Sequence, residues 1–436
     1  MIEHNTHASA HIIELRRDYK NQPIRDEENV LRILAHDIRL ANVARFNEFS
    51  DQLMLWQPVP GTLAAAESST SRFPRPWADI DTTALQAYIQ SKHLPGVGRD
   101  KVEAAVALQA RQIGSFHPVR DYLTGVHWDG RKRLHGLLPD YFGAYDKGQP
   151  EQYVAEVGLR WMISAVARVM TPGCQVDHLM VLEGPSQGEG KSSALRVLAK
   201  DEYFSDGLPH DLSHKDAKDH TRGKWIIELP ELTQFKRNEI ETLKAFITRR
   251  EEVFRPSYGR HKIRAPRQCV FAGTTNEAEY LVDPTGNRRF WGVAVGAVDL
   301  DALRRDRDQL WAEAVHWWRA GERWHLDRPM ELVAAQEASK RMATDPWALP
   351  ISSLLSEDYK LSHAVEVTPG DVLALMDLRE SERTPHNAKR VAAVLSSLGW
   401  KQGRKSMKGR CYVRPQTTAD DCHDADDAVS IRVHRG

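Results

Sequence analysis

Helical spacing of apolar residues dominates the first third of the chain. We expect residues 1–56 to be helical because their apolar positions recur at intervals of three and four. The residues that set this pattern are Val30, Leu31, Ile33, Leu34, Ile38 and Leu40. A Pro/Ser/Ala-rich connection follows at 57–76, and an aromatic-rich loop or hairpin is predicted at 115–134. The further helices predicted here are 82–91, 100–112 and 152–170.

The pattern changes near residue 178, where short apolar runs begin to alternate with helical segments. The predicted strands are 178–184, 224–229 and 268–274, and the predicted helices between them are 192–199 and 238–249. Strands alternating with helices favour a parallel α/β sheet.

A third pattern follows residue 335. A helix at 370–376, a turn at 379–385, a second helix at 386–398 and a basic strand-like end at 400–415 resemble a small winged-helix domain in outline. The Asp-rich tail is predicted to be disordered. The predicted domains are a mainly helical region at 1–150, an α/β core at 151–335, the winged-helix-like domain at 336–415 and the tail at 416–436.

Composition narrows the class of protein. The 436 residues are too many for one ordinary core and predict two or three domains. Lys and Arg together number 60, as do Asp and Glu, so only local clusters of charge can indicate a partner. The four cysteines form no Cys-x-x-Cys pair, which argues against a disulfide framework or a zinc site. The cysteine pattern therefore predicts a reducing cytoplasm, and no apolar run resembles a signal peptide or a membrane span.

Residues 179–198 read LMVLEGPSQGEGKSSALRVL, a buried strand followed by a glycine-rich turn and a helix. This order suits phosphate binding, because glycines let backbone N–H groups approach an anion and a helix N-terminus favours negative charge. Lys191 would reach the β- and γ-phosphates of ATP, and Ser192 would bind Mg²⁺. The spacing departs from the usual pattern, since five residues instead of four separate Gly184 from Gly190. The candidate nucleotide-binding residues are Gly184, Gly188, Gly190, Lys191, Ser192 and Ser193.

Hydrolysis of ATP also needs a carboxylate for the metal and a group that positions water. Glu228 ends the predicted strand 224–229, and Glu231 follows three residues later. We assign Glu228 to the Mg²⁺ and Glu231 to the water, although their roles could be exchanged. Asn276 follows the next predicted strand and would lie beside the γ-phosphate.

Two basic segments are further candidates. Arg288 and Arg289 lie in the turn Gly286–Trp291 and suit a phosphate clamp, either within one subunit or on a neighbour's ATP. Residues 249–267 carry seven Lys/Arg against two Glu, with aromatic residues between them, in what looks like a hairpin. Basic side chains contact a nucleic-acid backbone and aromatic rings stack on bases. The candidate DNA-binding residues are Arg255, Tyr258, Arg260, Lys262 and Arg264 here, and Lys401, Arg404 and Lys405 near the C-terminus.

Taken together, these motifs resemble the virulence-associated E family of phage and plasmid P-loop ATPases, which are related to superfamily 3 helicases. The resemblance covers roughly residues 85–300. The blocks that carry it, in order, are Phe116–Leu123, Trp128–Gly130, Val181–Ser192, Arg222–Glu231, Phe254–Arg260, Phe271–Asn276 and Asp283–Trp291.

The resemblance implies an AAA+-like core that works as a ring, expected to be a hexamer, with ATP between subunits. It also implies an arginine acting across the interface and a hairpin that grips single-stranded DNA in the channel. Relatives are often attached to a primase, so a separate primase or initiator is a possible partner. We therefore expect a Mg·ATP-dependent DNA helicase or translocase acting in replication initiation of a mobile element. The alternatives are a DNA-associated ATPase switch without unwinding activity and a P-loop phosphotransferase.

Overall fold

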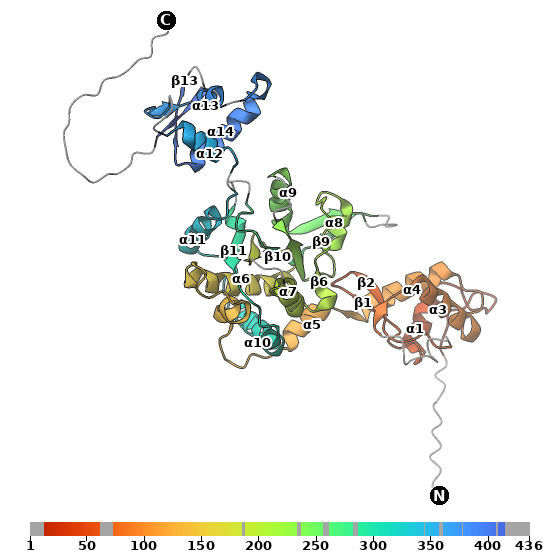
Figure 1. Ribbon diagram of the computed structural model, residues 1–436. Helices are drawn as coiled ribbons and strands as arrows, with labels where there is room; N and C mark the ends of the chain where they lie inside the picture. Colours follow the sequence, from red (N-terminus) through yellow and green to blue (C-terminus); the bar gives the residue numbers. More distant parts are fainter. Residues whose placement is uncertain are drawn as a thin grey trace. The chain divides into compact units, whose positions relative to one another are not determined.

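The structure is a computed structural model. It describes residues 13–61, 73–184, 188–232, 237–255, 261–281, 287–343, 345–356, 361–376, 378–406 and 409–414. The predicted tail at 416–436 lies outside the described residues. The chain forms two compact units, Met1–Met342 and Ala343–Gly436, and each is described on its own (Figure 1).

A five-stranded sheet forms the centre of the first unit. Its order is β11 (Phe290–Ala294), β5 (Leu179–Glu183), β10 (Val270–Thr275), β7 (Ile226–Pro230) and β6 (Phe204–Ser205). Every neighbouring pair is parallel, which confirms the predicted parallel α/β sheet. All residues of β5 and β10 are buried, as expected for strands covered on both faces.

Helices cover both faces of this sheet (Figure 1). Alternate residues of β5 enter different cores: Met180 and Leu182 pack on one side, and Leu179 and Val181 on the other. The first side holds α5 (Pro118–Gly125), α6 (Glu151–Met170), α7 (Lys191–Ala199), α10 (Leu300–Arg319) and α11 (Arg328–Ser339). The second side holds α8 (Lys215–His220) and α9 (Arg237–Ile247). The short helical turns of this unit are η1 (Leu134–Gly136), η2 (Leu137–Tyr141), η3 (Asp201–Tyr203) and η5 (Asn287–Arg289).

Buried tryptophans tie the helices to the sheet. The Trp161 indole donates a hydrogen bond to the Phe271 carbonyl at 2.9 Å, and that of Trp225 donates to the Ala165 carbonyl at 3.0 Å. Trp225 also stacks on Trp311 with ring centroids 4.1 Å apart. Each ring therefore buries a large apolar area while its indole N–H donor remains satisfied.

The N-terminal part of the first unit is not helical throughout, so that prediction for residues 1–56 is wrong. Within its described residues, the helix α1 (Glu27–His36) is followed by the antiparallel strands β1 (Ala44–Asn47) and β2 (Gln52–Leu55). Asp51 at φ 53° makes the turn between the strands, a left-handed conformation that Asp tolerates better than most residues. The other elements of this region are β3 (Arg75–Pro76), α3 (Asp79–Lys92), α4 (Arg99–Gln112) and β4 (Ser115–Phe116), and the sheet order is β3-β2-β1-β4.

The described part of the second unit contains helices, a helical turn and a small antiparallel sheet. In chain order its elements are α12 (Ala348–Leu354), β12 (Glu366–Val367), α13 (Pro369–Leu375), η6 (Glu380–Glu382), α14 (Pro385–Ser397), β13 (Lys401–Ser406) and β14 (Gly409–Val413). The sheet order is β12-β14-β13. The two helices predicted from the sequence are therefore present, and the predicted basic strand-like end is the antiparallel pair β13 and β14; α12 and β12 were not predicted.

Candidate functional site

The turn between β5 and α7 depends on glycine. Gly188 and Gly190 have φ angles of 86° and 87°, a conformation that L side chains rarely adopt. A Cβ atom at Gly190 would also lie 3.3 Å from the Cβ of Val298. Pro185 and its two successors lie outside the described residues. The glycines thus let the chain turn sharply into the N-terminus of α7.

Lys191 is the first residue of α7 and is 8% exposed. Its ammonium group lies 3.1 Å from the Gly184 carbonyl oxygen, 3.1 Å from a Glu189 carboxylate oxygen and 3.0 Å from Asn276 Oδ1. Gly184 directly follows β5, and Asn276 directly follows β10. Lys191 therefore joins the ends of two neighbouring parallel strands, and Asn276 lies beside its ammonium group.

Glu228 lies on β7 and is only 1% exposed. The hydroxyl groups of Ser192 and Thr274 donate to the same oxygen, Glu228 Oε1, at 2.7 and 2.6 Å. Among the described residues, the second carboxylate oxygen, Oε2, has no hydrogen-bond partner. Buried polar atoms normally have a partner, so Oε2 is the oxygen of this carboxylate that is available to a ligand.

These side chains surround a cavity of about 340 Å³ at the carboxyl ends of the central strands. Its lining is Gly188, Glu189, Gly190, Lys191, Ser192, Ser193, Glu228, Pro230, Glu231, Thr274, Thr275 and Asn276. Crevices at this edge of a parallel sheet are common ligand sites. Glu231 is exposed and has a φ of 49°, so a strained turn after β7 brings it to the cavity. Thr274 and Glu189 were not predicted, although Thr274 lies two residues before the predicted Asn276.

Arg288 and Arg289 do not line this cavity in their own chain. They lie in η5 at the start of β11, and β11 runs parallel to β5 with Phe290 opposite Leu179. The cavity lies at the other end of β5, five residues from Leu179, or about 16 Å at the rise of a strand. Arg288 is exposed and Arg289 is half-buried. The arginine pair therefore lies at the amino ends of the parallel strands, and the candidate phosphate site lies at their carboxyl ends.

A buried ionic cluster lies directly before the glycine-rich turn, and it was not predicted. Glu183, the last residue of β5, accepts hydrogen bonds from the Tyr280 hydroxyl (2.6 Å) and the Arg341 guanidinium. Arg341 also binds Glu337 of α11 at 3.0 Å. Burial raises the pKa of Tyr280 well above its ordinary value, so this residue remains a donor. The only sequence signal was an acid at the end of an apolar strand, because the partners of Glu183 lie far away in the chain.

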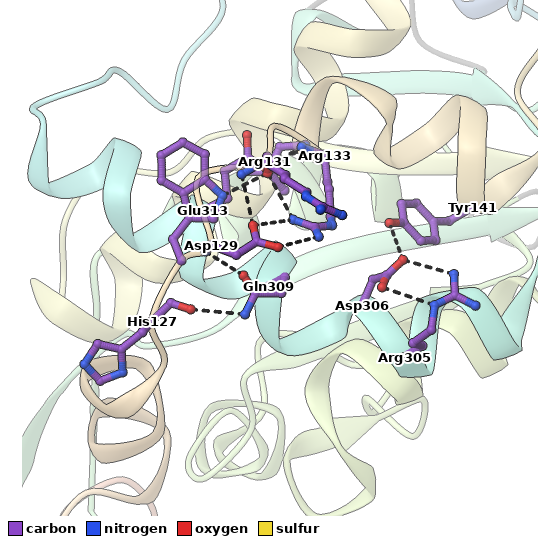
Figure 2. Close-up of polar contacts among 11 residues, drawn as sticks. His127, Asp129, Arg131, Arg133, Tyr141, Arg305, Asp306, Gln309 and Glu313 are labelled. Carbon is purple, nitrogen blue, oxygen red and sulfur yellow. Dashed lines mark hydrogen bonds and ion pairs between the residues drawn. The ribbon is translucent and has the colours of Figure 1, made fainter.

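The segment His127–Arg133 is held against α10 (Figure 2). The Arg133 guanidinium binds the Asp129 carboxylate at 2.7 Å and holds the pKa of Asp129 well below its usual range. Gln309 of α10 accepts from the Asp129 amide at 2.9 Å and donates to the His127 carbonyl at 3.1 Å. The buried Glu313 accepts from the Arg133 amide at 2.6 Å. The Trp128–Gly130 block thus has a structural role in fastening this loop.

The expected hairpin is formed by β8 (Glu251–Phe254) and β9 (Ile263–Pro266). Arg255 and Lys262 are exposed, and the exposed Arg264 pairs with Glu251 at 3.1 Å. Tyr258 and Arg260 lie outside the described residues. Arg267 is different from the other basic residues of this segment: it is buried, pairs with Glu252 and packs against Phe246.

The hairpin is also linked to the N-terminal sheet. Arg222 pairs with Asp51 in the turn between β1 and β2, and its guanidinium lies 5.9 Å from the centre of the Phe254 ring. The Gly223 amide donates to the Phe49 carbonyl at 3.0 Å, and a Cβ at Gly223 would lie 2.9 Å from that of Ser50. The Arg222–Gly223 pair therefore has a packing role at the junction of these two regions.

Lys401, Arg404 and Lys405 are exposed on β13 in the second unit.

Within the described residues, no group of three or more His, Cys, Asp or Glu side chains is arranged to hold a metal ion. None of the described helices is both long and apolar enough to cross a membrane.

Comparison with known proteins gives one family and a set of structures. The model of the virulence-associated protein E-like domain matches residues 123–343. A search of curated proteins gives no match. Three structures of the NrS-1 C-terminal region resemble the chain, two of them described as the A form apo structure and one as the apo structure. The two A form structures are 12% and 13% identical to the chain, with TM-scores of 0.44 and 0.46. The third is 11% identical with a TM-score of 0.42, and each comparison covers 89% of this chain and 99% of the other.

Proposed function

The chain belongs to the virulence-associated protein E-like family, and from this membership we propose that it is a Mg·ATP-dependent motor acting on DNA. We assign it to replication initiation of a phage or another mobile element, where it would unwind or translocate along DNA. The observation that carries the proposal is the cavity at which Lys191, Ser192 and Glu228 meet. A cation, a hydroxyl group and a buried carboxylate beside a glycine-rich turn are the groups that a P-loop ATPase uses.

Each of the side chains at the cavity would have its own role in ATP hydrolysis. Lys191 and the N-terminal amides of α7 would bind the β- and γ-phosphates. Ser192 and Glu228 would hold Mg²⁺, because Glu228 Oε2 has no partner among the described residues and Mg²⁺ prefers oxygen ligands. When bound, the ion would neutralise charge on the phosphates. Glu231 and Asn276 would orient the attacking water, and Glu231 would accept its proton.

The arginine pair favours an oligomer. Because Arg288 and Arg289 lie at the far edge of the sheet from their own cavity, an arginine that reaches ATP would come from a neighbouring subunit. An arginine supplied in this way can contribute about 10³–10⁵ in rate in GTPases. We therefore propose a homo-oligomeric ring, with a hexamer as the expected size, in which ATP lies between subunits.

The β8–β9 hairpin is the proposed grip on single-stranded DNA. Arg255, Lys262 and Arg264 are exposed there and would contact phosphates, and Tyr258 would stack on a base. The order of helices and strands in the second unit supports a winged-helix-like domain. A separate primase or initiator would act with the ring.

A regulatory ATPase switch is the main alternative, and a P-loop phosphotransferase the lesser one. A switch has no need of a DNA-gripping hairpin, and a phosphotransferase would need an acceptor pocket beside the γ-phosphate. The motor predicts that single-stranded DNA stimulates ATP hydrolysis and that ATP drives release of a labelled strand from a fork.

The test is a double variant, Tyr258→Ala with Lys262→Ala, and its control is the exposed Lys92→Ala of α3. Basal hydrolysis should survive in both, because neither change touches the cavity. Stimulation by DNA and strand release should vanish only in the double variant. A wild-type protein that hydrolyses ATP without any response to DNA, and releases no strand, would contradict the motor and favour the switch.

A further inference from the structure

The C-terminal unit contains a long segment of one charge sign. Residues 385–414 contain eight Lys and Arg residues and no Asp or Glu. The whole chain has equal numbers of acidic and basic residues, so this imbalance is local. The segment comprises α14, β13 and β14, which places the charge on one helix and one strand pair.

Two of these arginines have packing roles. Arg390 binds Asp345 at 2.8 Å and lies 4.1 Å from the centre of the Trp347 ring. Arg414 donates to the Leu355 and Leu361 carbonyls, each at 3.2 Å. Neither can therefore bind a partner unless these interactions break. The remaining described cations of the segment, all exposed, are Lys389, Lys401, Arg404, Lys405 and Arg410.

The helix of this segment has one buried and one exposed face. Val391, Val394 and Leu395 point into the core of the second unit. The exposed positions His386, Lys389, Ala393 and Ser396 are spaced by three, four and three residues, so they share one face of α14. That face has small, polar or cationic side chains and no large apolar group. It can enter a polar groove without leaving an apolar surface uncovered.

The chemistry of this face fits double-stranded better than single-stranded DNA. Proteins that grip single strands stack exposed aromatic rings on bases. In the described part of residues 385–414 both aromatic residues, Trp400 and Tyr412, are buried. The major groove of B-DNA, about 12 Å wide, admits an α-helix, and phosphates border it on both sides.

We propose that the C-terminal unit binds duplex DNA, with the exposed face of α14 in the major groove and the β13–β14 pair over adjacent phosphates. His386 and Lys389 would face base edges. Lys401, Arg404 and Lys405 would contact phosphates. This inference rests on the proposed DNA motor and deepens it: the C-terminal unit holds the duplex, and the hairpin of the first unit holds the separated strand.

The test measures binding of the full-length protein, without nucleotide, to a labelled duplex and to one of its strands over a range of salt concentrations. The variant combines Lys401→Ala, Arg404→Ala and Lys405→Ala. Its control removes the same charge at exposed positions elsewhere. The control substitutions are Lys20→Ala, Lys92→Ala and Lys215→Ala. Circular dichroism shows whether each variant is folded.

The salt dependence gives a quantitative expectation. The affinity of a protein for duplex DNA falls as the salt concentration rises, so the slope of log affinity against log salt is negative. Removing one cation that neutralises a phosphate should make this slope less steep by about 0.9. The triple variant should therefore bind duplex at least tenfold more weakly, while its affinity for the single strand and its DNA-stimulated ATPase stay close to those of the control. A further variant, His386→Ala with Lys389→Ala, should reduce discrimination between duplex sequences.

Two results would overturn the inference: a duplex slope equal to that of the control, or an equal reduction of affinity for duplex and single strand. The first would leave an acidic protein as the better partner for this face. Neither result would contradict the proposed DNA motor if DNA still stimulates ATP hydrolysis. Conversely, failure of the motor proposal would appear as absent ATP hydrolysis in the wild type, whereas duplex binding is measured without ATP.

Discussion

Gly292 of β11 is predicted to be intolerant of even one added methyl group. A Cβ at this position would lie 2.3 Å from Glu183 Oε1, 2.5 Å from Arg341 Nε and 2.6 Å from the Tyr280 hydroxyl. The Tyr280 hydroxyl and Arg341 Nε both bind Glu183 Oε1, and all three residues are buried, so these atoms cannot move aside into water. Gly292→Ala should therefore separate the Glu183–Arg341 pair. Breaking a buried ion pair costs about 3–5 kcal/mol.

The matched control is Gly125→Ala at the end of α5, where a Cβ would meet no atom within 4 Å. Alanine there should be neutral or stabilise the protein by less than about 1 kcal/mol. Urea unfolding of the full-length protein, followed through the transition of the larger unit, measures both variants. Because Glu183 directly precedes Gly184, Gly292→Ala should also weaken ATP binding. A change in unfolding free energy within about 1 kcal/mol of the control would refute the predicted role of the cluster.

Three further predictions concern the cavity, the interface and pH. Glu231→Gln should bind ATP but hardly hydrolyse it, whereas Glu228→Gln should weaken Mg²⁺-dependent binding; nucleotide trapping in the Glu228 variant alone would reverse the two roles. An alanine variant of the η5 arginine pair, mixed with Lys191→Ala, should recover part of the ATPase activity if the arginine acts in trans; no recovery in demonstrated mixed rings would contradict this. Burial lowers the pKa of His178 well below 6.5, so the unfolded chain binds a proton that the folded chain does not, and stability is lost as the pH falls below 6.5. His178→Phe should reduce that loss of stability in unfolding measurements between pH 7.5 and about 5.5, and an unchanged pH profile would contradict it.

Three strands of the central sheet could be predicted because they are continuous apolar runs, whereas β6 and β11 were not predicted. β5, β7 and β10 are buried on both faces, so their sequences stand out against amphipathic helices. The ordered motif blocks also predicted the family, which the match to residues 123–343 confirms. Prediction failed for β1 and β2, because four-residue strands contain too few positions to separate a period of two from a helical period.

The candidate cavity was largely predictable for a different reason. Its residues follow strands at one edge of a parallel sheet, and strand ends are visible in the sequence. The Glu183–Arg341 cluster was not predictable, because its partners are 158 residues apart and no local pattern joins them. The packing roles of Arg267 and Arg390 were hidden for the same reason. Charge density placed Arg267 in a basic segment and did not single out Arg390, and only the tertiary contacts of these arginines with Glu252 and Asp345 show that they are structural.

The most direct test of the account is ATP hydrolysis by the wild type and by Lys191→Ala, measured as phosphate release in the presence of Mg²⁺. Lys191 lies between Gly184 and Asn276 at the cavity, where it is expected to bind the β- and γ-phosphates. The wild type should hydrolyse ATP, and the variant should lose hydrolysis while its circular dichroism remains unchanged. Equal turnover by a folded Lys191→Ala variant would contradict the assignment of this cavity as the ATP site.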